Sequence, residues 1–478
     1  MTKTFYITTP IYYVNSDPHI GSAYTTIAAD ILARWNKLLG GKVFFLTGTD
    51  EHGQKIWEKA QEAEEDTQAY VDRHAESVKK LKKVLNLSYD NFVRTTDEHH
   101  KKAAQELWRR CEASGDIDKR KYKGLYCVGC EKFLQTRDLD EDGKCPFHPS
   151  KDPIELEEEN YFFKLSKYQN FLEEYLRRPD VIIPLHRLEE PKRFVANGLE
   201  DFSISREKEK LPWGVPVPND DDQVMYVWFD ALTNYISTLG WPEDSEGKFQ
   251  ALWQDGDTLQ IAGKDQIRFQ SIMWPAMLKS AGIEPPDRVF YHGFINSGGQ
   301  RMSKSIGNVI SPNELVEKYG TDATRYLLLR HVHPFDDTDV TWERLDEWYT
   351  ANLVNGLGNL VARVMKLAET HLDAPIVRPE AGGFPKEYTD RIDEFRMDQS
   401  LDYVWRRIGD LDEKITATEP FKLVKEDEEK GKTLIAELAQ ELYLIGRLLN
   451  SFMPETNMAI KEAVLANEKP ENLFPRLR

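Results

Sequence analysis

Cysteine is scarce in this chain, which has four among its 478 residues. So few thiols cannot cross-link a secreted scaffold of this size, and we expect a reducing, cytoplasmic location. Apolar runs of the roughly 20 residues that span a bilayer are absent too, and Met1–Tyr6 does not read as a signal peptide. These absences exclude a disulfide scaffold and predict a protein that uses no membrane.

Positive charge is also in short supply. Acidic side chains number 81 and basic ones 63, so the net charge is -18. Because phosphate binding normally goes with a basic surplus, this balance argues against DNA binding and against non-specific binding to any nucleic acid. A local cationic track is still compatible with it, and Arg363, Lys366 and the basic residues of 119–123 are the candidates. Binding there would depend strongly on salt.

What the sequence does contain is the pattern of an α/β protein, long enough for about three domains. Lys3–Thr8 and Lys42–Leu46 read as buried strands, and apolar residues at helical spacing from Ala23 to Leu38 predict a helix between them. Strand, helix and strand in this order predict a parallel sheet. Thr258–Ile261 and Arg288–Tyr291 are further expected strands. Ligands should bind where the strands end.

The pattern divides the chain into four segments. Residues 1–117 and 223–347 are expected to form the two halves of a Rossmann-type, parallel-sheet catalytic domain. Residues 118–222 break the pattern with paired cysteines and an acidic run, and are predicted to be an inserted connective module. From 348 to 478 only helical spacing remains, which predicts an all-α helical bundle.

Four residues of the insertion have the spacing of a metal site. Cys127-x2-Cys130 is followed, after fourteen residues, by Cys145-x2-His148. Two short-spaced pairs make two knuckles around a tetrahedral ion, and three cysteines with one histidine are a standard structural zinc set. A redox CxxC pair is the alternative, but it is typical of a βαβ context that is absent here. We expect one structural Zn²⁺ per chain, with Cys111 left as a core thiol.

Two further motifs suit a nucleotide. The first is Asp17-Pro18-His19-Ile20-Gly21-Ser22, between a strand and a helix, where helix N–H groups and His19 can bind phosphate. Its alternative is a turn histidine with a capping serine. The second is Arg301-Met302-Ser303-Lys304-Ser305, in which two cations flank hydroxyl groups and Lys304 can follow charge developing on a polyphosphate. Its alternative is a solvated basic loop.

Together these motifs are the two signatures of class I aminoacyl-tRNA synthetases, and the chain resembles the methionyl-tRNA synthetase family in particular. The supporting stretches are YITTPIYYVNSDPHIG, TGTDEHGQKI, WGVPVP, VWFDALTNYI, IAGKD, WPAML, YHGF and RMSKSIGN. The resemblance implies an ATP-dependent methionine–tRNA ligase, which forms methionyl-adenylate and pyrophosphate and then loads the 3′ end of tRNA(Met). It also implies Mg²⁺ with the ATP, and a monomer is expected.

The resemblance assigns roles to individual residues. Those implied to bind ATP are His19, Gly21, Ser22, Gly263, Asp265, His292, Arg301 and Lys304, of which His19 and Lys304 are catalytic. Those implied to bind methionine are Ile11, Tyr13, Asp50, Trp228, Ala231, Leu232, Tyr235 and Gln270. Those implied to read the anticodon are Asn359, Arg363 and Phe421.

Each set has an alternative in ordinary structure. Asp50, the expected partner of the methionine ammonium, could be a capping or surface residue, and the aromatic residues could be plain core. Asn359 and Arg363 share one helix face, which could simply be solvated. Four positions depart from the family pattern: Ser22 and Gln270 replace histidines, Arg301 replaces a lysine and Phe421 replaces a tryptophan.

Two rival functions remain. Another class I synthetase, for valine, isoleucine, leucine or cysteine, is the nearest. The first three usually carry a long editing insertion, and the cysteine enzyme a zinc ion in its substrate pocket. A non-catalytic RNA-binding relative is the other rival, but it would be expected to lose His19, Asp50 or Lys304, and all three are present.

Overall fold

The structure is a computed structural model that describes residues 4–15, 17–127, 132–134, 139–146, 152–302, 307–380 and 382–477. The chain forms two compact units, each built from segments that are distant in sequence. Unit 1 comprises Met1–Asp17, Asn36–Lys80 and Ser88–Tyr291, and unit 2 comprises Pro18–Trp35, Leu81–Leu87 and His292–Arg478. Within the described ranges, no helix combines the length and the apolar character needed to cross a membrane.

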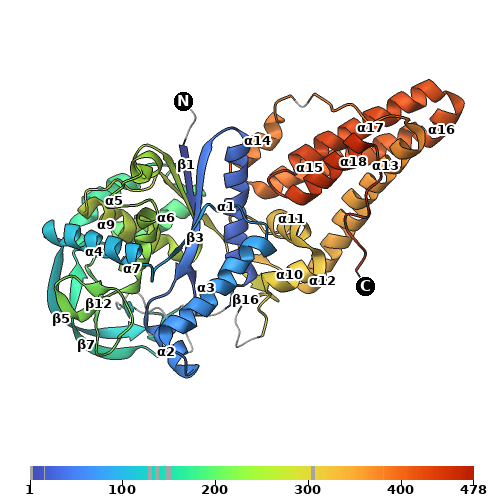
Figure 1. Ribbon diagram of the computed structural model, residues 1–478. Helices are drawn as coiled ribbons and strands as arrows, with labels where there is room; N and C mark the ends of the chain where they lie inside the picture. The colour runs from blue at the N-terminus through green and yellow to red at the C-terminus, as the bar shows by residue number, and fades with distance from the viewer. Residues whose placement is uncertain are drawn as a thin grey trace. The chain divides into compact units, whose positions relative to one another are not determined.

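Unit 1 is organised around a seven-stranded sheet with the order β2-β3-β1-β13-β14-β8, with β4 beside β3. Figure 1 shows β1 and β3 of this sheet side by side. Neighbours β1 and β3, β1 and β13, β2 and β3, β3 and β4, and β8 and β14 all pair in parallel. This confirms the predicted parallel sheet. Its strands are β1 (Thr4–Thr8), β2 (Tyr12–Tyr13), β3 (Lys42–Asp50), β4 (Asn91–Arg94), β8 (Ile182–Ile183), β13 (Asp257–Gly263) and β14 (Arg288–His292).

Two boundaries differ from the expectation. β3 runs on past Leu46, so that Asp50 is the last residue of the strand rather than a residue after it. Leu38, counted among the buried apolar positions of the first helix, is 42% exposed, because it lies in the last turn of α1 (Ile20–Leu38). The other apolar residues of that pattern are buried.

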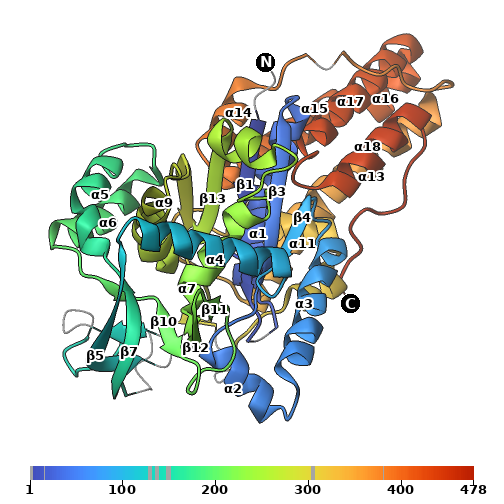
Figure 2. The same cartoon turned by 60° about the vertical axis from the view of Figure 1, so that its left-hand side comes forward.

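Residues 118–222 contribute most of two smaller sheets of unit 1. The first is antiparallel, with the order β6-β5-β7-β9, and Figure 2 shows β5 and β7 side by side. The second has the order β10-β12-β11. The same range supplies β8 to the parallel sheet. The strands are β5 (Ile117–Cys127), β6 (Lys132–Leu134), β7 (Ile154–Phe163), β9 (Phe202–Ser203), β10 (Ser205–Glu207), β11 (Pro216–Val217) and β12 (Asp220–Met225).

In unit 1, α4 packs against α7, α8 and α9, and α5 packs against α6 and α9. Trp108 of α4 and Trp274 of α9 are fully buried in the resulting core. The helices are α2 (Gln54–Glu62), α3 (Thr67–Val84, whose end belongs to unit 2), α4 (Glu98–Ala113), α5 (Gln169–Tyr175), α6 (Glu189–Ala196), α7 (Val227–Leu232), α8 (Asn234–Ser237) and α9 (Trp274–Ser280), with a π-helical turn at Phe269–Met273.

Unit 2 is mainly helical. α17 packs against α13, α15, α16 and α18, and both views show these helices side by side (Figures 1 and 2). The predicted apolar stripe that starts at Leu353 faces this core, although Leu367 is only half-buried. The elements are α1, α10 (Pro312–Tyr319), α11 (Thr321–His331), α12 (Trp342–Trp348), a π-helical stretch (Tyr349–Gly358), α13 (Asn359–His371), α14 (Lys386–Asp393), α15 (Met397–Thr418), α16 (Pro420–Glu426), α17 (Glu428–Leu448), α18 (Pro454–Ala466), and strands β15 (Ile295–Ser297), β16 (Gln300–Arg301) and β17 (Thr338–Asp339).

Candidate functional site

Most of the side chains expected to hold methionine lie together in unit 1. Leu232 and Tyr235 are buried in one apolar cluster, and Ile11 and Trp228 pack against it, half-buried. Ala231 is buried beside Leu232 on α7. An apolar wall of this kind suits an unbranched thioether side chain. A thioether accepts hydrogen bonds only weakly, so a protein recognises it mainly by shape and by sulfur–aromatic contact.

Gln270 joins the same cluster through a hydrogen bond. It is fully buried, and its Nε2 donates to the Tyr235 hydroxyl at 2.6 Å. The main-chain carbonyl of Tyr235 accepts a hydrogen bond from Tyr6 Oη at 2.7 Å. Burial raises the pKa of the Tyr235 hydroxyl, which therefore stays protonated at neutral pH. The glutamine is thus locked to Tyr235, with one of its N–H groups already in use.

Trp228 has a partner that the sequence analysis did not single out. The rings of Trp228 and Phe269 are stacked, with centroids 3.8 Å apart and planes 10° from parallel. Phe269 precedes Gln270 on the π-helical turn. The signal available in the sequence was this adjacency alone, because an aromatic residue in a helical segment is more often ordinary core.

Asp50 lies at the carboxyl end of β3, directly opposite Tyr13 of β2 in the parallel register. Its residue is 8% exposed. Tyr13 packs against a second cluster formed around Val14 and Ile56, apart from the wall that holds Tyr235. The structure therefore places Tyr13 beside Asp50 and leaves the apolar wall to the other side chains.

The strongest polar feature near this site was missed by the sequence analysis. Asp230 is fully buried on α7, and its two oxygens lie 2.6 Å from Nδ1 of His52 and 2.8 Å from Nε2 of His100. Burial alone would raise the pKa of Asp230, but the two histidines outweigh it and lower the pKa to about 2. This chain of three residues ties the end of β3 to α4 and α7. An aspartate inside the apolar run VWFDAL was the available signal, because it needs a buried partner.

The nucleotide motif in unit 2 has a defined local geometry. His19 Nδ1 accepts a hydrogen bond from the N–H of Gly21 at 3.0 Å, so the neutral ring carries its proton on Nε2. A Cβ on Gly21 would stand 2.8 Å from the ring, which explains the glycine. The Ser22 hydroxyl donates to the His19 carbonyl at 2.9 Å, and its oxygen accepts a hydrogen bond from the His19 N–H at 3.3 Å, which caps the start of α1. His19 thus sits at a helix N-terminus, the arrangement that binds phosphate.

His292 is engaged by the protein on both sides of its ring. Nδ1 lies 2.7 Å from the carbonyl oxygen of Gly293, and Nε2 lies 2.6 Å from Thr25 Oγ1 on α1. The residue is 6% exposed. These contacts make it a support for the first helix of unit 2, and its predicted contact with ATP stays a prediction.

The lysine-serine loop is described at its two ends. Asn308 Nδ2 donates to the carbonyls of Ser297 and Arg301, at 3.0 and 3.2 Å, which brings the ends together. The exposed Arg301 lies over the ring of Phe294, 3.8 Å from its centroid. Lys304 lies outside the described residues. In unit 1, Gly263 ends β13 and the exposed Asp265 follows in a 3-10 turn.

Half of the expected zinc set can be placed. Cys127 and Cys145 are both 1% exposed and lie in one small cluster with Leu134. Cys130 and His148 lie outside the described residues, and no group of three or more potential ligands occurs in the rest. The donor chemistry of the two placed thiols fits a structural zinc ion. The expected core thiol Cys111 is fully buried and donates to the Met277 carbonyl.

The helical residues expected to meet tRNA lie on α13 and α16. Asn359 is exposed, and Arg363 one turn later forms an ion pair with Asp412 of α15. Phe421 is 44% exposed on α16. Both helices pack against α17.

The expected cationic track is already paired with carboxylates. Lys119 contacts Asp220 at 2.7 Å, and Lys123 contacts Glu155 at 3.0 Å. On α13, Lys366 is paired with Glu369. Asp220 belongs to β12 and Glu155 to β7, so carboxylates of two strands neutralise part of the positive charge that the sequence suggested around residues 119–123. Such surface pairs are weak, so a phosphate could still displace them.

Comparison with known proteins gives a consistent result. The family model for "tRNA synthetases class I (M)" matches residues 5–152 and 149–365. A methionine–tRNA ligase of Thermotoga maritima is 42% identical over 98% of this chain and 76% of its own length, and one of a Nostoc species is 48% identical over 77% and 70%. The structure of Mycobacterium tuberculosis methionyl-tRNA synthetase in complex with methionyl-adenylate superimposes with a TM-score of 0.89 at 35% identity, covering 100% of this chain and 98% of that one.

Proposed function

Because the chain belongs to the class I tRNA synthetase (M) family, we propose that it is a methionine–tRNA ligase. It activates methionine with ATP to give methionyl-adenylate and pyrophosphate, and then transfers methionine to the 3′ end of its tRNA. The observation that supports the proposal is that one unit contains both a carboxylate at the end of a central strand, Asp50, and a buried wall formed by Leu232, Tyr235 and Gln270.

The chemistry follows from the groups that the chain offers. The methionine carboxylate attacks the α-phosphorus of ATP in line, and pyrophosphate leaves with the electron pair of the broken bond. His19 and the N-terminus of α1 bind phosphate oxygens, with the His19 proton held on Nε2. Gly263 and Asp265 hold the ribose and adenine. Lys304 and Arg301 stabilise the charge that develops on the leaving pyrophosphate, and Mg²⁺ arrives with the nucleotide.

The insertion and the helical part have supporting roles in this proposal. Residues 118–222 hold one Zn²⁺ through Cys127, Cys130, Cys145 and His148, and the closed ligand set makes the ion structural. Residues 348–478 form the anticodon-binding bundle, in which Asn359 and Arg363 contact unstacked bases and Phe421 stacks on one. The cytoplasmic location and the monomeric state stay predictions.

Methionine-dependent exchange of pyrophosphate into ATP tests the proposal. Methionine should support exchange, whereas valine, isoleucine, leucine and cysteine should support little. Lys304→Ala should lower the rate by a factor of about a hundred or more, the loss expected for one transition-state donor, with little change in methionine affinity. Preference for another amino acid would identify a different class I synthetase. The absence of exchange with any amino acid would indicate the non-catalytic relative.

A further inference from the structure

The two residues that follow Asp50, Glu51 and His52, are anchored to different parts of unit 1. Side chains alternate along an extended segment, so Thr49 and Glu51 point one way and Asp50 and His52 the other. The contacts agree with this, because Thr49 Oγ1 donates to Glu51 Oε1 at 2.5 Å whereas His52 reaches Asp230 of α7. Residues 49–52 are called the Asp50 segment below.

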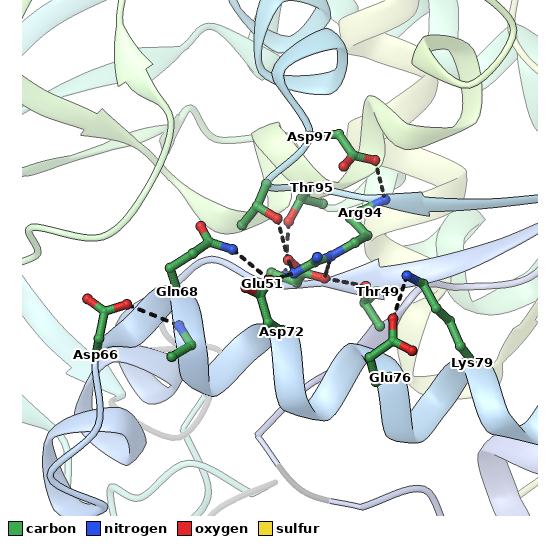
Figure 3. Close-up of polar contacts among 12 residues, drawn as sticks. Thr49, Glu51, Asp66, Gln68, Asp72, Glu76, Lys79, Arg94, Thr95 and Asp97 are labelled. Atoms are coloured by element: carbon green, nitrogen blue, oxygen red, sulfur yellow. Dashed lines mark hydrogen bonds and ion pairs between the residues drawn. The ribbon is translucent and has the colours of Figure 1, made fainter.

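Glu51 is the most completely anchored member of the Asp50 segment (Figure 3). Its side chain is fully buried, and Arg94 binds the carboxylate with two parallel hydrogen bonds, from Nε at 2.7 Å and from Nη2 at 2.8 Å. Thr96 Oγ1 donates to the same carboxylate at 2.5 Å. Arg94 in turn reaches Asp72 of α3 at 2.5 Å. The buried charge is therefore both neutralised and surrounded by donors.

The main chain of Glu51 is held as firmly as its side chain. The N–H of Glu51 donates to Thr95 Oγ1 at 2.9 Å, and its carbonyl accepts a hydrogen bond from Trp213 Nε1 at 2.6 Å. Both peptide groups that follow Asp50 in the segment are thus fixed by side chains. The Asp50 backbone is itself paired with β2 on the other side.

A purely structural role would not require this chemistry. A buried ion pair contributes little net stability compared with apolar residues of the same shape, because desolvation offsets the attraction. What the arrangement does provide is a defined position, since a bidentate pair fixes direction as well as distance. Arg94 serves the carboxylates of both Glu51 and Asp72, so its charge is already taken up beside the Asp50 segment.

We propose that Glu51, held by Arg94, is a positioning residue that aims the Asp50 carboxylate at the ammonium group of methionine. This inference rests on the proposed function, since it takes methionine as the substrate. Glu51 acts through Asp50 and touches no reacting atom. The prediction is that disturbing the pair weakens recognition of the ammonium group and leaves recognition of the thioether side chain intact.

The main variant is Glu51→Gln, which keeps the shape of the side chain and removes the negative charge to which Arg94 donates its two hydrogen bonds. In the exchange assay its KM for methionine should rise by about ten- to a hundredfold, as expected when a binding group is misplaced by up to an ångström. Its KM for ATP should change by less than about twofold, since the phosphate-binding groups lie elsewhere. Arg94→Lys keeps the charge but loses the two-pronged contact, and should give a smaller rise in the same direction.

A substrate analogue separates positioning from general damage. 4-(Methylthio)butanoate is methionine without its amino group, and its inhibition constant against methionine reports recognition of the side chain and the carboxylate without the ammonium group. The wild type should bind it more weakly than methionine. Glu51→Gln should bind the analogue as tightly as the wild type does. The ratio between the affinities for methionine and for the analogue should therefore become smaller in this variant. Equal weakening of both compounds, or no change in either, would overturn the inference.

The controls keep the result interpretable. Glu76→Gln removes the exposed Glu76–Lys79 pair, on the same helix as Asp72, and should change none of these constants (Figure 3). Thermal unfolding should show that each variant is folded, and if Glu51→Gln is not, Arg94→Lys carries the test. If the wild-type protein does not support methionine-dependent exchange, the proposed function is refuted. If the wild type is active but the ratio of the affinities for methionine and the analogue is unchanged in the variants, only the role of Glu51 is refuted.

Discussion

Two arginine–carboxylate pairs with a fully buried carboxylate, one in each unit, show how the same chemistry serves different ends. In unit 2, Arg325 and Asp30 are both fully buried, with Nη2 and Oδ2 2.7 Å apart. The remaining donors of Arg325 go to main-chain carbonyls of distant segments, those of Leu85, Ser451 and Phe452. In unit 1, the Glu51–Arg94 pair is completed by threonine hydroxyls from nearby residues and by the half-exposed Asp72.

The difference lies in what each pair joins. Arg325 connects three stretches of chain that unit 2 must bring together: 18–35, 81–87 and the turn before α18. Losing it therefore disturbs the whole unit. Glu51 and Arg94 join the ends of two adjacent strands, β3 and β4, which the sheet already holds in place. Their pair is free to specify the detailed position of the Asp50 segment. Partners thus indicate role better than burial does.

The largest expected effect is on the stability of unit 2. Arg325→Ala leaves several buried carbonyls without their donor, whereas Asp30 keeps its ion pair with the partly exposed Arg34, so the free energy of unfolding should fall by about 2–4 kcal/mol. Urea unfolding measures this directly. The double variant Asp30→Leu with Arg325→Met should recover part of the loss, since the fully buried carboxylate and guanidinium are then both replaced by apolar groups. If Arg325→Ala lowered the free energy of unfolding by less than about 1 kcal/mol, the Arg325–Asp30 pair would not have the structural role that distinguishes it from the Arg94–Glu51 pair.

A smaller effect on stability is expected when the pH is lowered and a half-buried histidine of unit 2, His331, becomes protonated. Burial, reinforced by Arg330, lowers the pKa of His331 to about 3, and its ring is stacked on Trp348 with centroids 4.2 Å apart. In the unfolded chain the pKa is about 6.5, so between these values the unfolded state binds the proton. Stability should therefore fall as the pH drops from about 6.5 towards 3. His331→Phe should flatten this dependence, as measured by melting temperatures at pH 7.5, 5.5 and 4.

The smallest effect is expected in unit 1, at lower pH. The folded-state pKa of Asp230 is about 2, below the unfolded value of about 3.9, so its contribution is present above about pH 4 and lost as the pH falls towards 2. Asp230→Asn should remove that dependence, which lies below about pH 4. If melting temperature depended on pH in the same way in the His331 and Asp230 variants, the two residues would not make separate contributions to the pH dependence of stability.

Much of the fold could be predicted because it depends on local pattern. β1, β3, β13 and β14 are buried runs bounded by polar residues and glycine, and each was expected within a few residues of its position. β8 was not expected, because two isoleucines carry no period, and the sheet alone makes them a strand. The acidic run of β7 suggested an irregular module, and only its pairing with the basic β5 makes it extended.

The amino-acid sequence by itself determined the parallel sheet, the two nucleotide motifs and the family, because these depend on neighbours along the chain. The tertiary structure alone decided the partners of the buried charges. Glu51 meets Arg94 43 residues away, and Asp230 meets His52 and His100 at separations of 178 and 130 residues. The apolar run around Asp230 indicates that this aspartate needs a buried partner, but nothing in the local sequence identifies the partner of Asp230 or of Glu51. A buried charge must find its counter-charge wherever folding brings one, and no local periodicity records where that is.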